Sequence, residues 1–132
     1  MQAKELMSHP IVTVRSSDSL LHAARLMQGH SGGCVIVGDE DNKAEAVLTE
    51  HDICVAAALE DRALSKLHVA AAMSNSLHAC RPDDEVSKVE QIMDEHQVWR
   101  LPVVDKMGRA IGLLALDDIA QEARRERDLF AP

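Results

Sequence analysis

The sequence predicts a mixed α/β fold in which two β-α-β-β-α units pack sheet against sheet about a pseudo-twofold axis. Three observations indicate this class: the chain repeats itself at half its length, both halves carry the same succession of apolar patterns, and either half alone is too small for a stable core. The 132 residues are 46% hydrophobic and 27% charged, which suffices for one packed interior. Since the chain contains one Trp, one Phe and no Tyr, that interior is expected to be aliphatic.

The internal repeat has a period of 66 residues. Eight residues recur at this spacing: Met7, Arg15, Asp18, Met27, His30, Leu48, Asp52 and Ile53 match Met73, Arg81, Asp84, Met93, His96, Leu114, Asp118 and Ile119. After the first helix of each half the match needs a two-residue shift, which aligns residues 34–36 with residues 102–104. We therefore expect a first repeat with its connector over residues 1–66 and a second repeat with a C-terminal helix over residues 67–132.

Each half predicts the same elements in the same order. The strands are expected from short apolar runs with turn-like flanks, over residues 11–14, 34–37 and 46–48 and over residues 77–80, 101–104 and 111–114. A helix with a buried stripe follows the first strand of each half, on Leu20, Ala23, Ala24 and Met27 and on Val86, Val89 and Met93. A closing helix begins around Asp52 and around Asp118. The Ala-rich segment 57–73 has a helical pattern and is expected to connect the halves.

Composition and charge exclude several classes of protein. A formal net charge of -8 argues against a nucleic-acid partner, because phosphate polyanions would be repelled. No apolar stretch is long enough to span a bilayer, and the N-terminus has no pattern of a secretory signal, so no membrane partner is expected. Cys34, Cys54 and Cys80 form neither an even framework nor a CxxC pair, and the seven histidines lack the spacing of metal ligands. These features predict a cytoplasmic protein with reduced thiols and no bound metal.

Motifs in both halves resemble the CBS repeat, a family named after cystathionine beta-synthase. They are clearest in residues 98–105 and 112–119 of the second half and in residues 46–53 of the first half, and the resemblance covers essentially the whole chain. It implies a tandem pair of repeats, or Bateman module, that binds an adenosyl ligand such as AMP, ADP, ATP or S-adenosylmethionine. It further implies a face-to-face homodimer that signals ligand binding to a separate effector protein, with no cofactor required beyond the regulatory ligand.

The resemblance places the main site at Thr49 and Asp52, at the start of a closing helix. An ionised Asp52 can accept two hydrogen bonds from a ribose diol, and the Thr49 hydroxyl can donate to a phosphate beside the N–H groups of the helix end. Adenine is expected in the apolar seam, near the backbone of Ile11, Val12 and Thr13. The same Thr-x-x-Asp pattern is also a capping box, and both roles can coexist.

Two further residues of the main site lie in the loop before the strand at residues 101–104. In the family this loop reaches the phosphate bound at the other repeat, so Arg100 is expected to clamp a phosphate through its guanidinium group. The alternative for Arg100 is a surface salt bridge. Trp99 could cover the ligand, but the edge of the core or a dimer contact are equally open alternatives.

A second, weaker site is expected around Asp118. Ala115 stands where the family has Ser or Thr, so the hydroxyl donor is missing. The matching loop in the first half contains Gly32 and Gly33 and no cation; the glycines could offer N–H groups to an anion or simply allow a turn. His78, in the second half's counterpart of the first strand, is grouped with this site.

These features predict a regulatory nucleotide sensor and not an enzyme. His51 between Glu50 and Asp52 could suggest acid–base chemistry, but adjacent residues at a helix start diverge, and no nucleophile or metal set accompanies them. The alternative is an assembly module whose nucleotide sites are degenerate and bind nothing.

Overall fold

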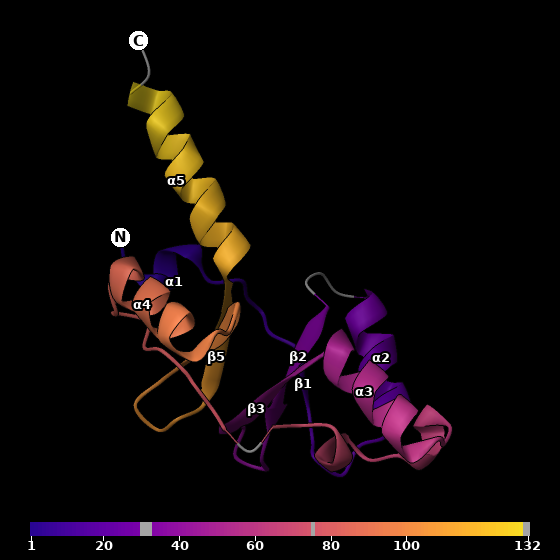
Figure 1. Ribbon diagram of the computed structural model, residues 1–132. Helices are drawn as coiled ribbons and strands as arrows, with labels where there is room; N and C mark the ends of the chain where they lie inside the picture. The colour runs from indigo at the N-terminus through magenta and orange to yellow at the C-terminus, as the bar shows by residue number, and fades with distance from the viewer. Residues whose placement is uncertain (30–32, 75, 131–132) are drawn as a thin grey trace.

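The fold, seen in a computed structural model, has two lobes of similar construction, and the structure describes residues 1–29, 33–74 and 76–130 (Figure 1). The first half of the chain forms α1 (Ala3–Leu6), β1 (Thr13–Val14), α2 (Leu20–Gly29), β2 (Cys34–Gly38), β3 (Ala44–Thr49) and α3 (Glu50–Glu60). The rest of the chain forms η1 (Leu64–Lys66), η2 (Val69–Ala71), α4 (Val86–His96), β4 (Arg100–Val104), β5 (Ala110–Ala115) and α5 (Leu116–Phe130). The helices and the longer strands lie where the apolar patterns predict them.

The backbone pairing fixes the register of the repeat without any shift. In the first sheet Cys34 pairs with Thr49 and Val35 with Leu48, while in the second sheet Arg100 pairs with Ala115 and Leu101 with Leu114. Every pair in one sheet is thus displaced by 66 residues from a pair in the other. The predicted two-residue shift is wrong, because apolar letters match at several offsets along a buried strand whereas hydrogen bonds allow one register. Arg100 is therefore the counterpart of Cys34.

The two sheets differ in one strand. In the first sheet β1 runs parallel to β2, and the Ile36 N–H donates to the Val12 carbonyl at 3.2 Å. In the second sheet the predicted strand over residues 77–80 is reduced to a single bridge between Cys80 and Val103. The reason is Pro102, the counterpart of Ile36, which has no N–H to donate to the corresponding carbonyl of His78.

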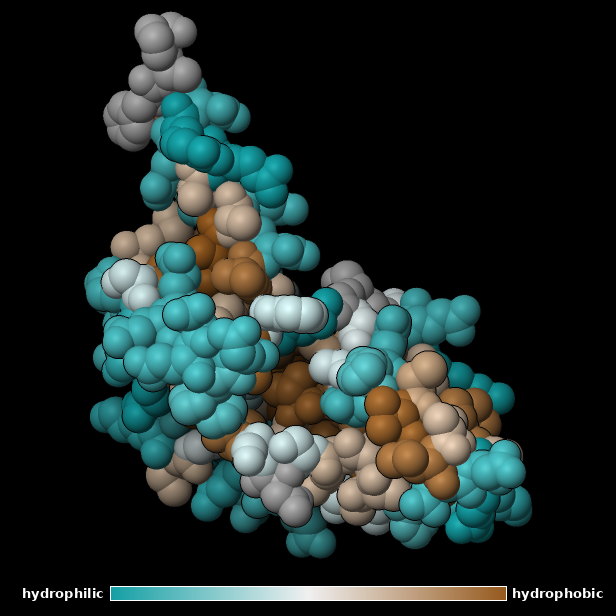
Figure 2. All heavy atoms as spheres, in the orientation of Figure 1, coloured by the Kyte–Doolittle hydropathy of each residue, from teal (hydrophilic) through white to brown (hydrophobic). Residues whose placement is uncertain are grey.

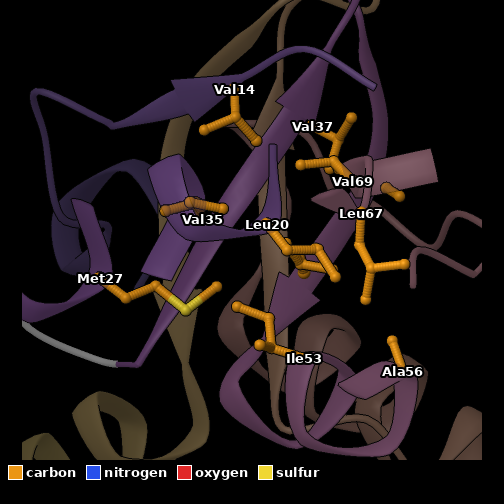
Figure 3. Packing of buried hydrophobic residues seen from close by; sticks show 12 residues of the cluster. Val14, Leu20, Met27, Val35, Val37, Ile53, Ala56, Leu67 and Val69 are labelled. Carbon is orange, nitrogen blue, oxygen red and sulfur yellow. The ribbon is translucent and has the colours of Figure 1, made fainter. Parts of the chain in front are cut away.

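Each lobe has its own buried core, and each core includes residues from the other half of the sequence. Leu67 and Val69 are buried in the first core (Figure 3), and the Val69 N–H donates to the Asp18 carbonyl at 2.8 Å. Reciprocally, Ala3 is buried in the second core, and its N–H donates to the Asp84 carbonyl at 2.8 Å. The first residues of each sequence repeat therefore pack in the lobe formed mainly by the other repeat. The lobes thus do not coincide with the sequence repeats 1–66 and 67–132.

The connector between the halves is not the continuous helix that its composition predicts. The helix α3 stops at Glu60, and Asp61 turns the chain in the left-handed region with φ 49°. The segment then forms two short 3₁₀ turns, η1 and η2. An Ala-rich composition favours helix locally, but the burial of Leu67 and Val69 against α2 requires the chain to leave the helix axis.

The two sheets meet at the pseudo-twofold axis through their hairpin turns. The Ala44 N–H donates to the Gly108 carbonyl at 3.0 Å, and the Ala110 N–H donates to the Asn42 carbonyl at 3.1 Å. The lobes flank this contact in Figure 1, with α2 and α3 on one lobe, α1 and α4 on the other, and α5 projecting away from the body. None of the described helices is long and apolar enough to cross a membrane.

Candidate functional site

A cleft of about 640 Å³ opens between the lobes where β3 ends and α3 begins. Its lining residues come from both halves of the chain and are Val47, Thr49, His51, Asp52, Ser74, Ser76, Leu77, His78, His96, Gln97, Val98, Trp99 and Arg100. The face of the molecule in Figure 2 is hollowed between the two lobes, with hydrophobic residues at the bottom of the hollow. The cleft thus brings together four predicted residues of the main site: Thr49, Asp52, Trp99 and Arg100.

Asp52 is held in place by a capping box at the start of α3. The Thr49 N–H donates to Asp52 Oδ2 at 2.9 Å, and the Asp52 N–H donates to Thr49 Oγ1 at 3.2 Å. The cap that the sequence pattern allows is therefore present. It leaves the Thr49 hydroxyl hydrogen available as a donor, and Asp52 Oδ1 has no hydrogen bond among the described residues. The cap orients both side chains without using all of their hydrogen-bonding capacity.

Arg100 and Trp99 approach the same cleft from β4 and the residue before it. Arg100 is half-buried and forms no salt bridge in the described part of the chain, so the predicted surface ion pair is not found. Trp99 lines the cleft with 71% of its surface exposed, which excludes the predicted position at the edge of the core. Its backbone carbonyl accepts from the Leu116 N–H at 2.8 Å, and this bond ties the loop to the start of α5.

Three histidines complete the cleft, a feature that the sequence analysis missed. The imidazole rings of His78 and His96 are stacked, with centroids 3.7 Å apart and planes inclined by 14°. His51, in the first turn of α3, lines the same cleft. His78 was expected at the second site, but the structure places it at the first, beside Leu77. The signal that could have shown this is the 66-residue period, because His78 is the counterpart of Val12.

A second cleft occupies the pseudo-symmetric position and is smaller, about 200 Å³. Ile11 and Val12 line this cleft together with Cys34 and Leu113, so the structure does not bring them to Thr49 and Asp52 as predicted. Thr13 pairs with Ile36 in the sheet and lines neither cleft. The predicted position of Ile11 and Val12 at the main site is therefore wrong, because the apolar pattern does not show to which lobe each strand belongs.

Two lining residues of the smaller cleft are paired through their backbones. The Ser8 N–H donates to the Leu113 carbonyl at 2.8 Å, and the Leu113 N–H donates back to the Ser8 carbonyl at 3.1 Å. The counterpart positions, Ser74 and Val47, line the open cleft without such a bond among the described residues. This backbone pairing is one difference between the two clefts.

The predicted residues of the second site are not assembled into one pocket. Asp118 Oδ2 accepts from the Ala115 N–H at 3.4 Å, a long half of the capping box seen at Thr49. Gly33 adopts φ +62°, a backbone conformation that favours glycine, and its counterpart in the other half is Trp99. Gly32 lies outside the described residues.

A thiol replaces the guanidinium group in the smaller cleft. Cys34, the counterpart of Arg100, is buried, and burial raises its pKa against the opposing influence of the nearby Arg100. A neutral Cys34 cannot hold a phosphate as the guanidinium group of Arg100 can. The structure thus supplies a physical basis for two unequal clefts.

Two pseudo-symmetric lobes with a cleft between them define a tandem-repeat module, and comparisons with known proteins identify the repeat. The family model of the CBS domain matches residues 3–58 and 69–125. The CBS domain-containing protein YhcV of Bacillus subtilis is 31% identical over 117 residues, which cover 89% of this chain and 81% of that protein. The chain belongs to the CBS domain family.

Solved structures agree with this assignment. A CBS domain pair in complex with 5′-methylthioadenosine and S-adenosyl-L-methionine is 25% identical, with a TM-score of 0.87 and coverage of 96% of this chain and 98% of that chain. The cytosolic domain of the Mg²⁺ channel MgtE in complex with ATP is 25% identical, with a TM-score of 0.77 and coverage of 92% and 48%. An enzyme, L-aspartate semialdehyde sulfurtransferase of Methanocaldococcus jannaschii, is 25% identical, but the chain spans 22% of its length.

Proposed function

We propose that this chain is a regulatory module that binds an adenosyl ligand in the open cleft and signals its presence to a separate effector protein. The observation that carries the proposal is the convergence of the capped Asp52 of one half and Arg100 of the other on one cleft. The similar CBS domain pair in complex with S-adenosyl-L-methionine and the similar MgtE cytosolic domain in complex with ATP support an adenosyl ligand as the class. Catalysis is not part of this proposal.

The adenine ring is expected to lie against the segment of Leu77 and His78. Because Pro102 has no N–H, no described backbone donor reaches the His78 carbonyl oxygen. This oxygen lies on a residue that lines the cleft and can accept a hydrogen bond from the exocyclic amine of adenine. Val47, Leu77 and Val98 supply apolar surface for the faces of the ring.

The ribose and phosphate are expected to lie toward α3. The Asp52 carboxylate has acceptor capacity for the 2′- and 3′-hydroxyls, and the Thr49 hydroxyl can donate to a phosphate. The N-terminus of α3 offers N–H groups and the positive end of its dipole to the same anion. Arg100 would then close on the phosphate from the opposite lobe, so ligand binding would bridge the two halves.

Binding of adenosine measured by calorimetry tests this assignment of Asp52. Asp52→Asn retains an oxygen that can cap the Thr49 N–H but removes the charge that favours a ribose diol. We expect this variant to lose about tenfold or more in adenosine affinity, as removal of a charged hydrogen-bond acceptor predicts. Asp118→Asn, at the counterpart position outside the open cleft, is the matched control and should bind normally. Equal affinities of the Asp52→Asn variant and the parent protein would show that Asp52 is only a cap.

An assembly module with degenerate nucleotide sites is the second candidate function. The small volume of the second cleft, whose lining residues Ser8 and Leu113 are paired through their backbones, favours it. Absence of binding of AMP, ATP and S-adenosylmethionine at millimolar concentration would establish this alternative and refute the sensor.

We also propose that the module works in the cytoplasm as a homodimer. The closing helices α3 and α5 present exposed apolar side chains at Val55, Leu59 and Leu129, which are candidates for the contact. Light scattering tests the assembly: a mass of two chains is expected, and a mass of one chain would refute it. Detection of the protein in a secreted fraction would contradict the cytoplasmic location.

A further inference from the structure

The turn between α4 and β4 lies between the open cleft and a second hollow of the same lobe. This second hollow, which we call the α4 groove, has a volume of about 470 Å³ and is lined by residues of α4, of the turn and of the start of α5. The turn residues Gln97, Val98 and Trp99 line both the open cleft and the α4 groove. A ligand that orders this turn in the open cleft therefore also acts on the shape of the α4 groove.

Apolar side chains are exposed at the end of the α4 groove. Trp99 has 71% of its surface exposed and Leu116 has 38%, and the Leu116 N–H donates to the Trp99 carbonyl at 2.8 Å, so the two residues are neighbours. Both line the α4 groove and an adjoining hollow of about 290 Å³. In Figure 2, hydrophobic residues lie at the surface where α5 begins. An exposed tryptophan among apolar neighbours is typical of the centre of a protein interface.

Carboxylates surround these apolar side chains. Glu90 and Asp94 line the α4 groove one helical turn apart, and Asp117 lines the adjoining hollow. None of the three forms an ion pair in the part of the chain that the structure describes, and no described Lys or Arg lines the α4 groove. Like charges four residues apart on a helix repel each other, and a cation from a partner would remove this repulsion. The groove therefore complements a segment that is basic and carries a bulky apolar side chain.

We propose that the α4 groove is the docking surface for the effector protein, and that the effector presents a basic amphipathic helix to it. The inference rests on the proposed function and names the surface and the chemistry of the partner. A second copy of this chain fits less well, because the three arginines of its α5 are outnumbered by five carboxylates on the same helix. A groove that shares its turn with the ligand cleft also suits a partner that must distinguish the occupied cleft from the empty one.

Backbone hydrogen bonds join the shared turn to both helices that border the groove. The Val98 N–H donates to the Met93 carbonyl of α4 at 3.0 Å, and the Trp99 carbonyl accepts from the Leu116 N–H of α5. In the proposed binding mode the ligand contacts Val98 and Arg100, the residues on either side of Trp99. A bound ligand therefore fixes Trp99 in the position that the effector meets, so the effector should bind the occupied module more tightly. Linkage requires the effector to raise the affinity for the ligand by the same factor.

Titration of the full chain with two synthetic helical peptides tests the proposal. One peptide has leucine on one face and lysine on the other, and the second has glutamate in place of lysine, so both offer the same apolar face. Trp99 is the sole tryptophan of the chain, so its fluorescence reports binding beside it. We expect the basic peptide to bind at least about tenfold more tightly than the acidic one. Saturating ATP should raise the affinity for the basic peptide by about fivefold or more.

Two double variants with the same change of net charge separate the groove from general attraction to an acidic protein. Glu90→Gln with Asp94→Asn removes both carboxylates of the α4 groove, and Asp83→Asn with Glu95→Gln removes two exposed carboxylates outside it. The first variant should bind the basic peptide about tenfold more weakly, and the second should bind it as the parent protein does. None of these residues lines the open cleft, so ATP alone should bind both variants normally. Equal losses in the two variants would overturn the docking surface.

The remaining outcomes distinguish this proposal from the proposed function. If ATP binds but leaves the affinity for the basic peptide unchanged, the groove does not report the ligand and the inference is wrong, while the sensor stands. If light scattering shows a dimer of the parent protein that dissociates in the Glu90→Gln and Asp94→Asn variant, a second copy covers the groove and the effector does not. Failure of ATP, adenosine and S-adenosylmethionine to bind would refute the proposed function itself, and with it the control of the groove by a ligand.

Discussion

At the scale of the residue, one missing backbone N–H distinguishes the open cleft from the smaller cleft. The Ile36 N–H completes the pairing of β1 by donating to the Val12 carbonyl, whereas Pro102 leaves the corresponding carbonyl of His78 without this donor. A proline inside a sheet normally weakens it, since one ladder bond is lost. Here the lost bond leaves an acceptor on a residue that lines the open cleft.

Pro102→Val should engage this acceptor, the His78 carbonyl oxygen, in a backbone hydrogen bond. Valine restores an N–H at a buried position whose counterpart is Ile36. The new bond to the His78 carbonyl is expected to extend the single bridge between Cys80 and Val103 into a strand. We expect adenosine affinity to fall by about fivefold, as the loss of one neutral hydrogen bond predicts. Calorimetry measures the affinity, and slow hydrogen exchange of the residue 102 amide reports the new bond. A protected amide with unchanged affinity would show that the His78 carbonyl does not contact the ligand.

At the scale of the element, the closing helices α3 and α5 differ in their N-caps. Thr49 caps α3 reciprocally with Asp52, while Ala115 can only donate its N–H to Asp118, over 3.4 Å. The first N–H groups of α5 therefore lack the side-chain acceptor that those of α3 have. The longer helix of the pair starts from the weaker cap.

Ala115→Thr is expected to supply the missing half of the box. The hydroxyl would accept from the Asp118 N–H as Thr49 accepts from the Asp52 N–H, and the free energy of unfolding should rise by about 1 kcal/mol. Thr49→Ala is the mirror experiment and should lower it by a similar amount. Urea unfolding measures both. A destabilising Ala115→Thr substitution would mean that α5 does not begin with the geometry of α3.

Elements with their own apolar stripe could be predicted from the sequence, and those set by distant packing could not. The stripe on Leu20, Ala23 and Met27 predicts α2 because helical periodicity is a local property. The path of residues 61–73 depends on where Leu67 and Val69 find their core, which no local pattern shows. The site divides in the same way: Thr49 and Asp52 belong to one short motif, whereas the contact of His78 with His96 joins segments 18 residues apart in the sequence.

At the scale of the whole molecule, the exchange of first segments makes the two lobes interdependent. Leu67 and Val69 fill the core of the first lobe, and Ala3 is fully buried in that of the second, so neither lobe keeps its core if the chain is divided at the sequence repeat. The hairpin contacts at the pseudo-twofold axis add hydrogen bonds between the lobes. Both features favour cooperative unfolding over separate transitions.

Val69→Ala tests this interdependence, because Val69 belongs to the second repeat in the sequence but is buried in the core of the first lobe. Val69 is fully buried against the first core, so the deletion of two methyl groups leaves a cavity there and should lower the free energy of unfolding by about 1–3 kcal/mol. Because the lobes share segments, urea should still unfold the variant in one transition that fluorescence of Trp99 in the second lobe and circular dichroism report at the same midpoint. If Trp99 followed an unchanged transition while part of the ellipticity melted earlier, the lobes would be independent folding units. A ligand bound between the lobes would then have little effect on their relative position. In a cooperative molecule, a ligand that contacts both Asp52 and Arg100 acts on both lobes at once.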